Sequence, residues 1–210
     1  MSNLSAQDPA AEKKPALQVK WLAVTAALDL GQVYLLSGDV KSPAFDLPMN
    51  NVSDAIAVTQ RAFSLKSVNK DLSLCAIELP EAGKEFIIVL SPTKGGSYRS
   101  VIVRTDDPSF RRGDVFFLNL TTHTVLGKLG TRPLILESGK SAITRPDGPK
   151  EKGYYDIAFA TRQETEDRIF SSSRWPIDDQ IRSYLFFLQE QSGRITYRAV
   201  DEFIPAEKRP

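Results

Sequence analysis

The chain contains one cysteine, Cys75, and one histidine, His123, and nucleophilic or transition-metal chemistry would have to use these two side chains. A cysteine nucleophile needs a base beside it. Cys75 lies in the alternating run 72–77, where a lone cysteine is typically a small buried side chain. His123 stands among threonines in a polar segment, and a blue-copper centre would need a second histidine. We therefore predict no catalytic residue, no metal site and no cofactor.

Acidic side chains are the other candidates for catalysis, because glycosidases use a pair of carboxylates whose spacing in sequence is not fixed. Acids cluster at Asp106–Asp107, at Glu164–Asp167 and at Asp178–Asp179. Each cluster also fits an ordinary turn between strands. A glycan-active hydrolase is therefore the alternative function, and it requires two acidic side chains within about 10 Å of each other in a cleft.

One aromatic group is the candidate contact surface. Trp175 precedes Pro176, which favours an extended backbone on a loop before the last hairpin. Together with Arg174, Tyr154 and Tyr155, Trp175 would stack on a sugar or anchor a protein partner. The alternative is that Trp175 plugs one end of the fold.

Charge and hydropathy exclude two classes of partner. The 210 residues include 27 Lys and Arg against 26 Asp and Glu, for a net charge of +1. Such a chain lacks the cationic face that nucleic-acid binding requires, so we expect no nucleic-acid partner. No apolar run approaches the roughly 18 residues of a membrane-spanning helix, so we expect no transmembrane segment. A protein or a glycan is the expected partner, and the sequence specifies no oligomeric state.

The N-terminal segment indicates where the protein resides. Residues 1–17 are small, charged and proline-bearing, which predicts a disordered leader or tether. The segment Met1–Gln7 is similar to the end of a secretory signal, although the apolar core of such a signal is absent. We expect export to the periplasm or the cell surface, with a cytoplasmic location as the alternative.

Short apolar or alternating runs bounded by Gly, Pro, Asn, Asp or Ser fill the rest of the chain, as in an all-β protein. The segments 86–90 and 115–118 are apolar on both faces, which predicts strands covered on both sides. Residues 54–65 fit either a helix or a strand, and we favour the strand. We expect three hairpins, which pair 19–27 with 32–36, 86–90 with 98–105, and 184–188 with 195–200.

These elements predict a single antiparallel β-sandwich of the Ig-like, Greek-key type over residues 18–205, with at most one or two short helices. No internal repeat is visible in the sequence. In the β-strand Tyr154–Thr161, the side chains of Tyr155, Ile157 and Phe159 should share one face.

The segment Phe110–Thr121, followed by Leu126–Gly130 and Leu136–Ser141, resembles exported bacterial β-sandwich proteins of the envelope. In them a glycine-led apolar strand ends in Asn, and a Gly-centred turn opens a later strand. The resemblance implies an Ig-like envelope-associated protein and transfers no site residues. We therefore expect a non-enzymatic binding or structural module, and a third interpretation is an accessory subunit that pairs through an edge strand.

Overall fold

The chain folds into sixteen β-strands arranged in four sheets of four strands, and no helix occurs among the described residues. The computed structural model describes residues 17–26, 30–70, 72–148, 153–162 and 166–205. The all-β prediction is therefore confirmed. The leader predicted over residues 1–17 lies outside the described residues, except for Leu17, which begins the first strand.

The sixteen strands divide equally between the two halves of the chain. The first half forms β1 (Leu17–Ala23), β2 (Val33–Ser37), β3 (Val40–Lys41), β4 (Ile56–Val58), β5 (Ala62–Ser67), β6 (Ser73–Glu78), β7 (Glu85–Pro92) and β8 (Tyr98–Arg104). The second half forms β9 (Val115–Asn119), β10 (Val125–Leu129), β11 (Arg132–Leu136), β12 (Ser141–Thr144), β13 (Tyr154–Arg162), β14 (Asp167–Pro176), β15 (Ile181–Gln189) and β16 (Ile195–Phe203).

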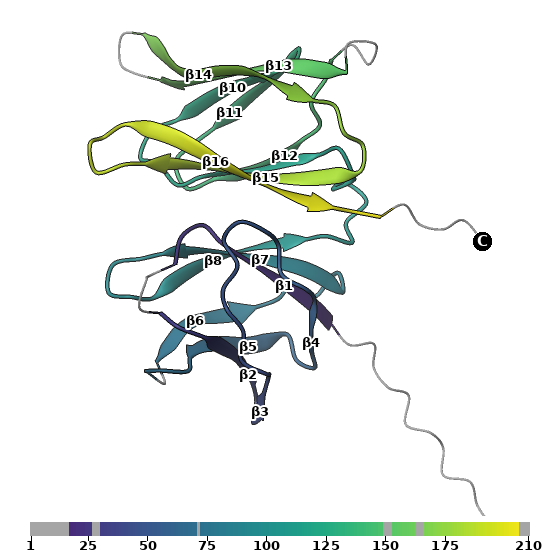
Figure 1. Cartoon of the computed structure of the whole chain (residues 1–210), viewed down its shortest axis with the longest axis vertical. Helices are drawn as coiled ribbons and strands as arrows, with labels where there is room; N and C mark the ends of the chain where they lie inside the picture. Colours follow the sequence, from purple (N-terminus) through teal and green to yellow (C-terminus); the bar gives the residue numbers. More distant parts are fainter. Residues whose placement is uncertain (1–16, 27–29, 71, 149–152, 163–165, 206–210) are drawn as a thin grey trace, which may run out of the picture.

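Each half forms its own pair of sheets, and the four sheets stack as layers (Figure 1). The first sandwich consists of an outer sheet in the order β3-β2-β5-β6 and an inner sheet in the order β4-β1-β7-β8. The second sandwich consists of an inner sheet in the order β12-β9-β15-β16 and an outer sheet in the order β11-β10-β13-β14. The two inner sheets face each other, so the prediction of a single sandwich is wrong. The prediction of purely antiparallel sheets is also wrong, because each inner sheet contains one parallel pair, β1–β7 or β9–β15.

Three apolar clusters fill the spaces between the four layers. Side chains on one face of β7, such as Phe86 and Ile88, belong to the core of the first sandwich. Ile87 and Val89, on the opposite face, belong to a central cluster that also contains Phe186 of β15. Because the middle of each inner sheet is covered on both faces, the central segments of β7 and β9 are apolar on both faces, as the sequence predicts for 86–90 and 115–118.

The second sandwich repeats the topology of the first, strand for strand, although no repeat is visible in the sequence. Adding eight to every strand number of the first two sheets gives the other two, and the parallel pair β1–β7 recurs as β9–β15. The prediction of no internal repeat therefore does not hold for the topology. The two halves therefore share a strand order without a visible likeness of sequence, because pairing and burial depend on the pattern of alternation and not on particular residues.

Two of the three predicted hairpins are confirmed, and one is wrong. The hairpins β7–β8 and β15–β16 form as predicted. Residues 54–65 contribute two strands, β4 and most of β5, and no helix. The predicted hairpin of 19–27 with 32–36 is wrong, because β1 pairs with β4 and β7 whereas β2 lies in the other sheet.

The one-domain prediction can be tested because each sandwich contains one of the two tryptophans, Trp21 or Trp175. The central cluster should couple the two sandwiches into one cooperative unit. In Trp21→Phe and Trp175→Phe variants, we expect the remaining fluorescence and the circular dichroism to give coincident urea unfolding midpoints. Adding Phe186→Ala should lower the free energy of unfolding by about 3–5 kcal/mol as seen by both fluorophores. A shift seen only by Trp175 would show that the sandwiches unfold independently.

Candidate functional site

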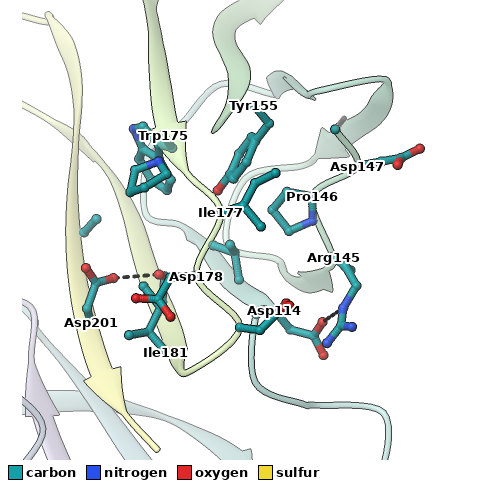
Figure 2. A pocket seen from close by; sticks show the side chains of 17 residues that line it. Asp114, Arg145, Pro146, Asp147, Tyr155, Trp175, Ile177, Asp178, Ile181 and Asp201 are labelled. Carbon is teal, nitrogen blue, oxygen red and sulfur yellow. Dashed lines mark hydrogen bonds and ion pairs between the residues drawn. The ribbon is translucent and has the colours of Figure 1, made fainter. Parts of the chain in front are cut away.

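A cavity of about 510 Å³ opens at one end of the second sandwich, between its inner and outer sheets (Figure 2). One wall comes from β13 and the end of β14, and the other from the beginning of β15 and from β16. The segments 145–148 and 177–179, which follow β12 and β14, complete the rim. We call this cavity the end pocket.

The aromatic wall of the end pocket consists of two directly paired strand residues. Tyr155 of β13 lies opposite Trp175 of β14, with ring centroids 6.4 Å apart. Trp175 also lies 6.1 Å from the ring of Tyr197 on β16. Trp175 is only partly buried, so it both packs against the core of the second sandwich and lines the pocket. It lies at the end of a strand, not on the loop that the sequence predicted.

Tyr155 contributes a polar atom that has no hydrogen-bond partner among the described residues. The residue is 6% exposed, and its hydroxyl points into the end pocket (Figure 2). Burial, and then the negative charge of Asp201, raise the pKa of Tyr155 well above its ordinary value. The phenol therefore stays protonated and can donate a hydrogen bond to a ligand.

Four of the carboxylates around the pocket have no cationic partner among the described residues. They belong to Asp147, Asp178, Asp179 and Asp201, and all four side chains are exposed. Asp201 accepts a hydrogen bond from the Ser183 hydroxyl at 2.6 Å. The other hydrogen bonds to these acids come from Thr131 to Asp147, at 2.8 Å, and from the Gln180 backbone to Asp178, at 2.7 Å.

The only cation that lines the pocket within the described ranges is already occupied. Arg145 Nε lies 2.7 Å from Asp114 Oδ1, and its guanidinium also donates to the Arg112 carbonyl at 2.5 Å. Asp114 is buried and accepts a second hydrogen bond from the Arg111 backbone, at 2.6 Å. The Asp114–Arg145 pair therefore fixes the segment after β12 against the start of β9.

Gly113 brings the acidic segment after β14 against the start of β9. Its φ of 82° lies in the left-handed region, which side chains avoid. A Cβ at this position would lie 3.0 Å from Asp179 Oδ1. A glycine is thus needed here for the Asp178–Asp179 segment to approach, and this approach forms one side of the rim.

The predicted contact residues divide between two faces of the outer sheet. Tyr155 and Trp175 point into the end pocket, whereas Tyr154 and Arg174 do not line it. The Arg174 guanidinium lies 5.0 Å from the Tyr154 ring and 3.1 Å from Asp156. Neighbouring residues of a strand point to opposite faces of the sheet. The four candidates are two neighbours on each of two paired strands, so all four cannot line the same site.

Only one of the predicted acidic clusters lies at the pocket. Asp178 and Asp179 line it. Asp106 instead accepts hydrogen bonds from Arg104 Nε, at 2.7 Å, and from the Lys84 backbone. Partial burial raises the pKa of Asp106, but these hydrogen bonds outweigh it and hold the pKa below its ordinary value. Asp167 pairs with Arg162, and residues 163–165, including Glu164, lie outside the described residues.

Sequence reasoning missed Asp201 and Arg145. Asp201 lies in the last hairpin, where an acid in an alternating run is typical of a solvent-facing position. Its proximity to the pocket comes from the pairing of β16 with β15, which places Asp201 opposite Ser183. A local pattern of residues carries no signal for such a contact.

Cys75 and His123 belong to different sandwiches. Cys75 is buried in the core of the first sandwich, and His123 is exposed between β9 and β10 of the second. No group of three or more His, Cys, Asp or Glu side chains suited to a metal ion occurs in the part of the chain that the structure describes. Nor does any helix there have the length and hydropathy to cross a membrane.

The sequence matches no protein-family model and no curated protein at a significant level. The function must therefore be inferred from the end pocket itself.

The Asp114–Arg145 pair gives a prediction about the stability of the pocket. We expect Arg145→Ala to lower the free energy of unfolding by about 1–3 kcal/mol, because it leaves a buried carboxylate without its charged donor. Urea denaturation measures this change. Arg174→Ala is the matched control, since both partners of the Arg174–Asp156 pair are well exposed and such pairs contribute at most about 1 kcal/mol. Equal losses for the two variants would contradict the structural role assigned to Arg145.

Proposed function

We propose that this chain is a non-enzymatic binding module of the bacterial envelope, exported to the periplasm or the cell surface, and that the end pocket holds its ligand. The observation that carries the proposal is the meeting of Tyr155, Trp175 and several carboxylates in one cavity of about 510 Å³. A cavity of this size falls in the usual range for small-molecule sites, about 300–1,000 Å³. The resemblance of 110–141 to exported envelope proteins and the polar leader support the location.

A glycan is the ligand that the chemistry of the pocket favours. An aromatic ring offers an apolar surface on which a sugar ring can stack. Carboxylates accept hydrogen bonds from sugar hydroxyls, and the free Tyr155 hydroxyl can donate one. Paired strands hold Tyr155, Trp175 and Asp201 in place, so little conformational entropy is lost when these groups bind a ligand.

We also infer that both sandwiches are of the Ig-like, Greek-key type. In the first half the chain passes from the inner sheet to the outer sheet and back twice before the hairpin β7–β8 closes the inner sheet. The second half follows the same route. This crossing between two sheets supports the Greek-key assignment.

A glycan-active hydrolase is the second candidate, because Asp178, Asp179 and Asp201 line the same pocket as Trp175. The acid of a glycosidase must be kept protonated by shielding from water. All three of these side chains are exposed, which favours binding without hydrolysis.

The proposal predicts glycan binding that depends on Trp175. On an array of peptidoglycan fragments and lipopolysaccharide oligosaccharides, we expect the wild type to retain a ligand. Trp175→Ala should weaken retention by roughly 5- to 150-fold, since a stacked aromatic ring contributes on the order of 1–3 kcal/mol at a binding site. Arg174→Ala, on the opposite face, should bind like the wild type. The affinities can be measured by calorimetry after circular dichroism has shown that each variant folds.

Incubation with the retained glycan distinguishes the two candidates. A binding module leaves the glycan intact. Release of reducing ends by the wild type, lost in Asp178→Asn or Asp201→Asn, would establish the hydrolase instead. Absence of any retained glycan, or equal retention by Trp175→Ala, would count against the end pocket as the binding site.

A further inference from the structure

The end pocket has a marked imbalance of charge in a chain that is almost neutral. The whole sequence has a net charge of +1. Four pocket carboxylates, those of Asp147, Asp178, Asp179 and Asp201, have no cationic partner in the described part of the chain, and Arg145 is held by Asp114. A concave site lined by charges of one sign, here negative, concentrates its electric field in the cavity. Such a field favours a positively charged ligand.

The Tyr155 hydroxyl provides an independent indication that a ligand belongs in this cavity. The residue is 94% buried, since only 6% is exposed. The hydroxyl faces the cavity and has no hydrogen-bond partner among the described residues, so it is free to bond to a ligand that enters. Asp201 lines the same cavity, and its charge helps to raise the pKa of this phenol. A ligand group between them could accept from the phenol or donate to it, while donating to the Asp201 carboxylate.

Comparison of the two sandwiches shows that these features are particular to the second. Tyr155 and Trp175 correspond in register to the pair Phe63 and Ile77 of the first sandwich. The backbone hydrogen bonds at this end correspond as well, because Ile177 N donates to Gly153 O just as Leu79 N donates to Arg61 O.

The corresponding end of the first sandwich is bridged by a side chain. The Arg61 guanidinium donates hydrogen bonds to the carbonyls of Pro80 and Gly83. The same topology thus carries an apolar pair and a cation at one end, and an aromatic pair with free carboxylates at the other.

The chemistry of the cavity points to an organic cation and not to a metal ion. No group of acids among the described residues is arranged to hold a metal. Trp175 lines the cavity, and a tryptophan face attracts an ammonium group through its quadrupole. The cavity, at about 510 Å³, has room for the carbon skeleton that carries the charge.

We propose that the end pocket selects a sugar that carries a free amino group, with the ammonium held by Asp201 and the Tyr155 oxygen and the sugar ring against Trp175. This inference rests on the proposed binding function of the same pocket and names its ligand class. An amino sugar satisfies both features of the site, since its hydroxyls match the remaining carboxylates and its ammonium matches their charge.

The test compares oligomers of glucosamine with the same oligomers after N-acetylation, which removes the charge and keeps the ring. We expect the free amine to bind at least about tenfold more tightly, the ratio given by one charge-assisted hydrogen bond. Asp201→Asn should abolish this preference, and Tyr155→Phe should reduce it. Asp156→Asn removes an acid on the outer face and should leave the preference unchanged. Raising the salt concentration should weaken binding of the free-amine oligomer but not of the acetylated one.

Several outcomes would overturn the inference. Equal or tighter binding of the acetylated oligomer would do so while leaving the proposed glycan-binding function in place. Binding of neither oligomer would also overturn it, and the glycan array would then show separately whether the binding function stands. Tighter binding of a lysine peptide than of either oligomer would assign the pocket to a protein partner. Retention of the preference by a folded Asp201→Asn variant would exclude the assigned contact.

Discussion

The two inner sheets bury each other's apolar faces, and the places of the other layers follow from this contact. An apolar sheet face has to be covered, and here the inner sheet of each sandwich covers the inner sheet of the other. Ile87 and Val89 of the first sandwich and Phe116 and Phe186 of the second are all buried in the central cluster. If the sandwiches separated, both inner sheets would expose a row of large apolar side chains to water.

Polar groups at the edge of this contact fix how the sandwiches meet. Arg198 of β16 donates hydrogen bonds to the carbonyls of Ala23 and Met49, each at 2.9 Å. Lys20 of β1 pairs with the buried Glu202 at 2.7 Å. Tyr184 donates to the same carboxylate at 2.7 Å, and burial, with the charge of Glu202, raises the pKa of this tyrosine well above its ordinary value. Directional bonds of this kind select one registration among the many that apolar packing alone would allow.

The two sandwiches share a topology and differ in the side chains at their corresponding ends. In both sandwiches the alternation of strands directs one residue of a pair inward and its neighbour outward. At the end of the second sandwich the inward pair is aromatic, and the acidic segment around Asp178 approaches through Gly113. At the corresponding end of the first sandwich, the inward pair is Phe63 and Ile77, and the Arg61 guanidinium donates hydrogen bonds to nearby backbone carbonyls. The difference between these ends, and not the fold that they share, is what supports a binding function.

The sequence alone predicts which residues of a strand share a face, and it predicts two of the three expected hairpins. Alternation placed Tyr155, Ile157 and Phe159 on one buried face, and glycine-bearing turns defined the hairpins β7–β8 and β15–β16. The strands that are apolar on both faces already implied covered sheets, since a lone two-layer sandwich leaves one face of each sheet in water. Packing in three dimensions selects which distant strands meet. It decides that β1 pairs with β7 and that the sheets stack in four layers. It also decides that Asp201 lines the end pocket, whereas Tyr154 and Arg174 do not. The physical reason is that alternation specifies which face of a strand is buried, whereas the partner that buries it is chosen by packing among all the sheets at once.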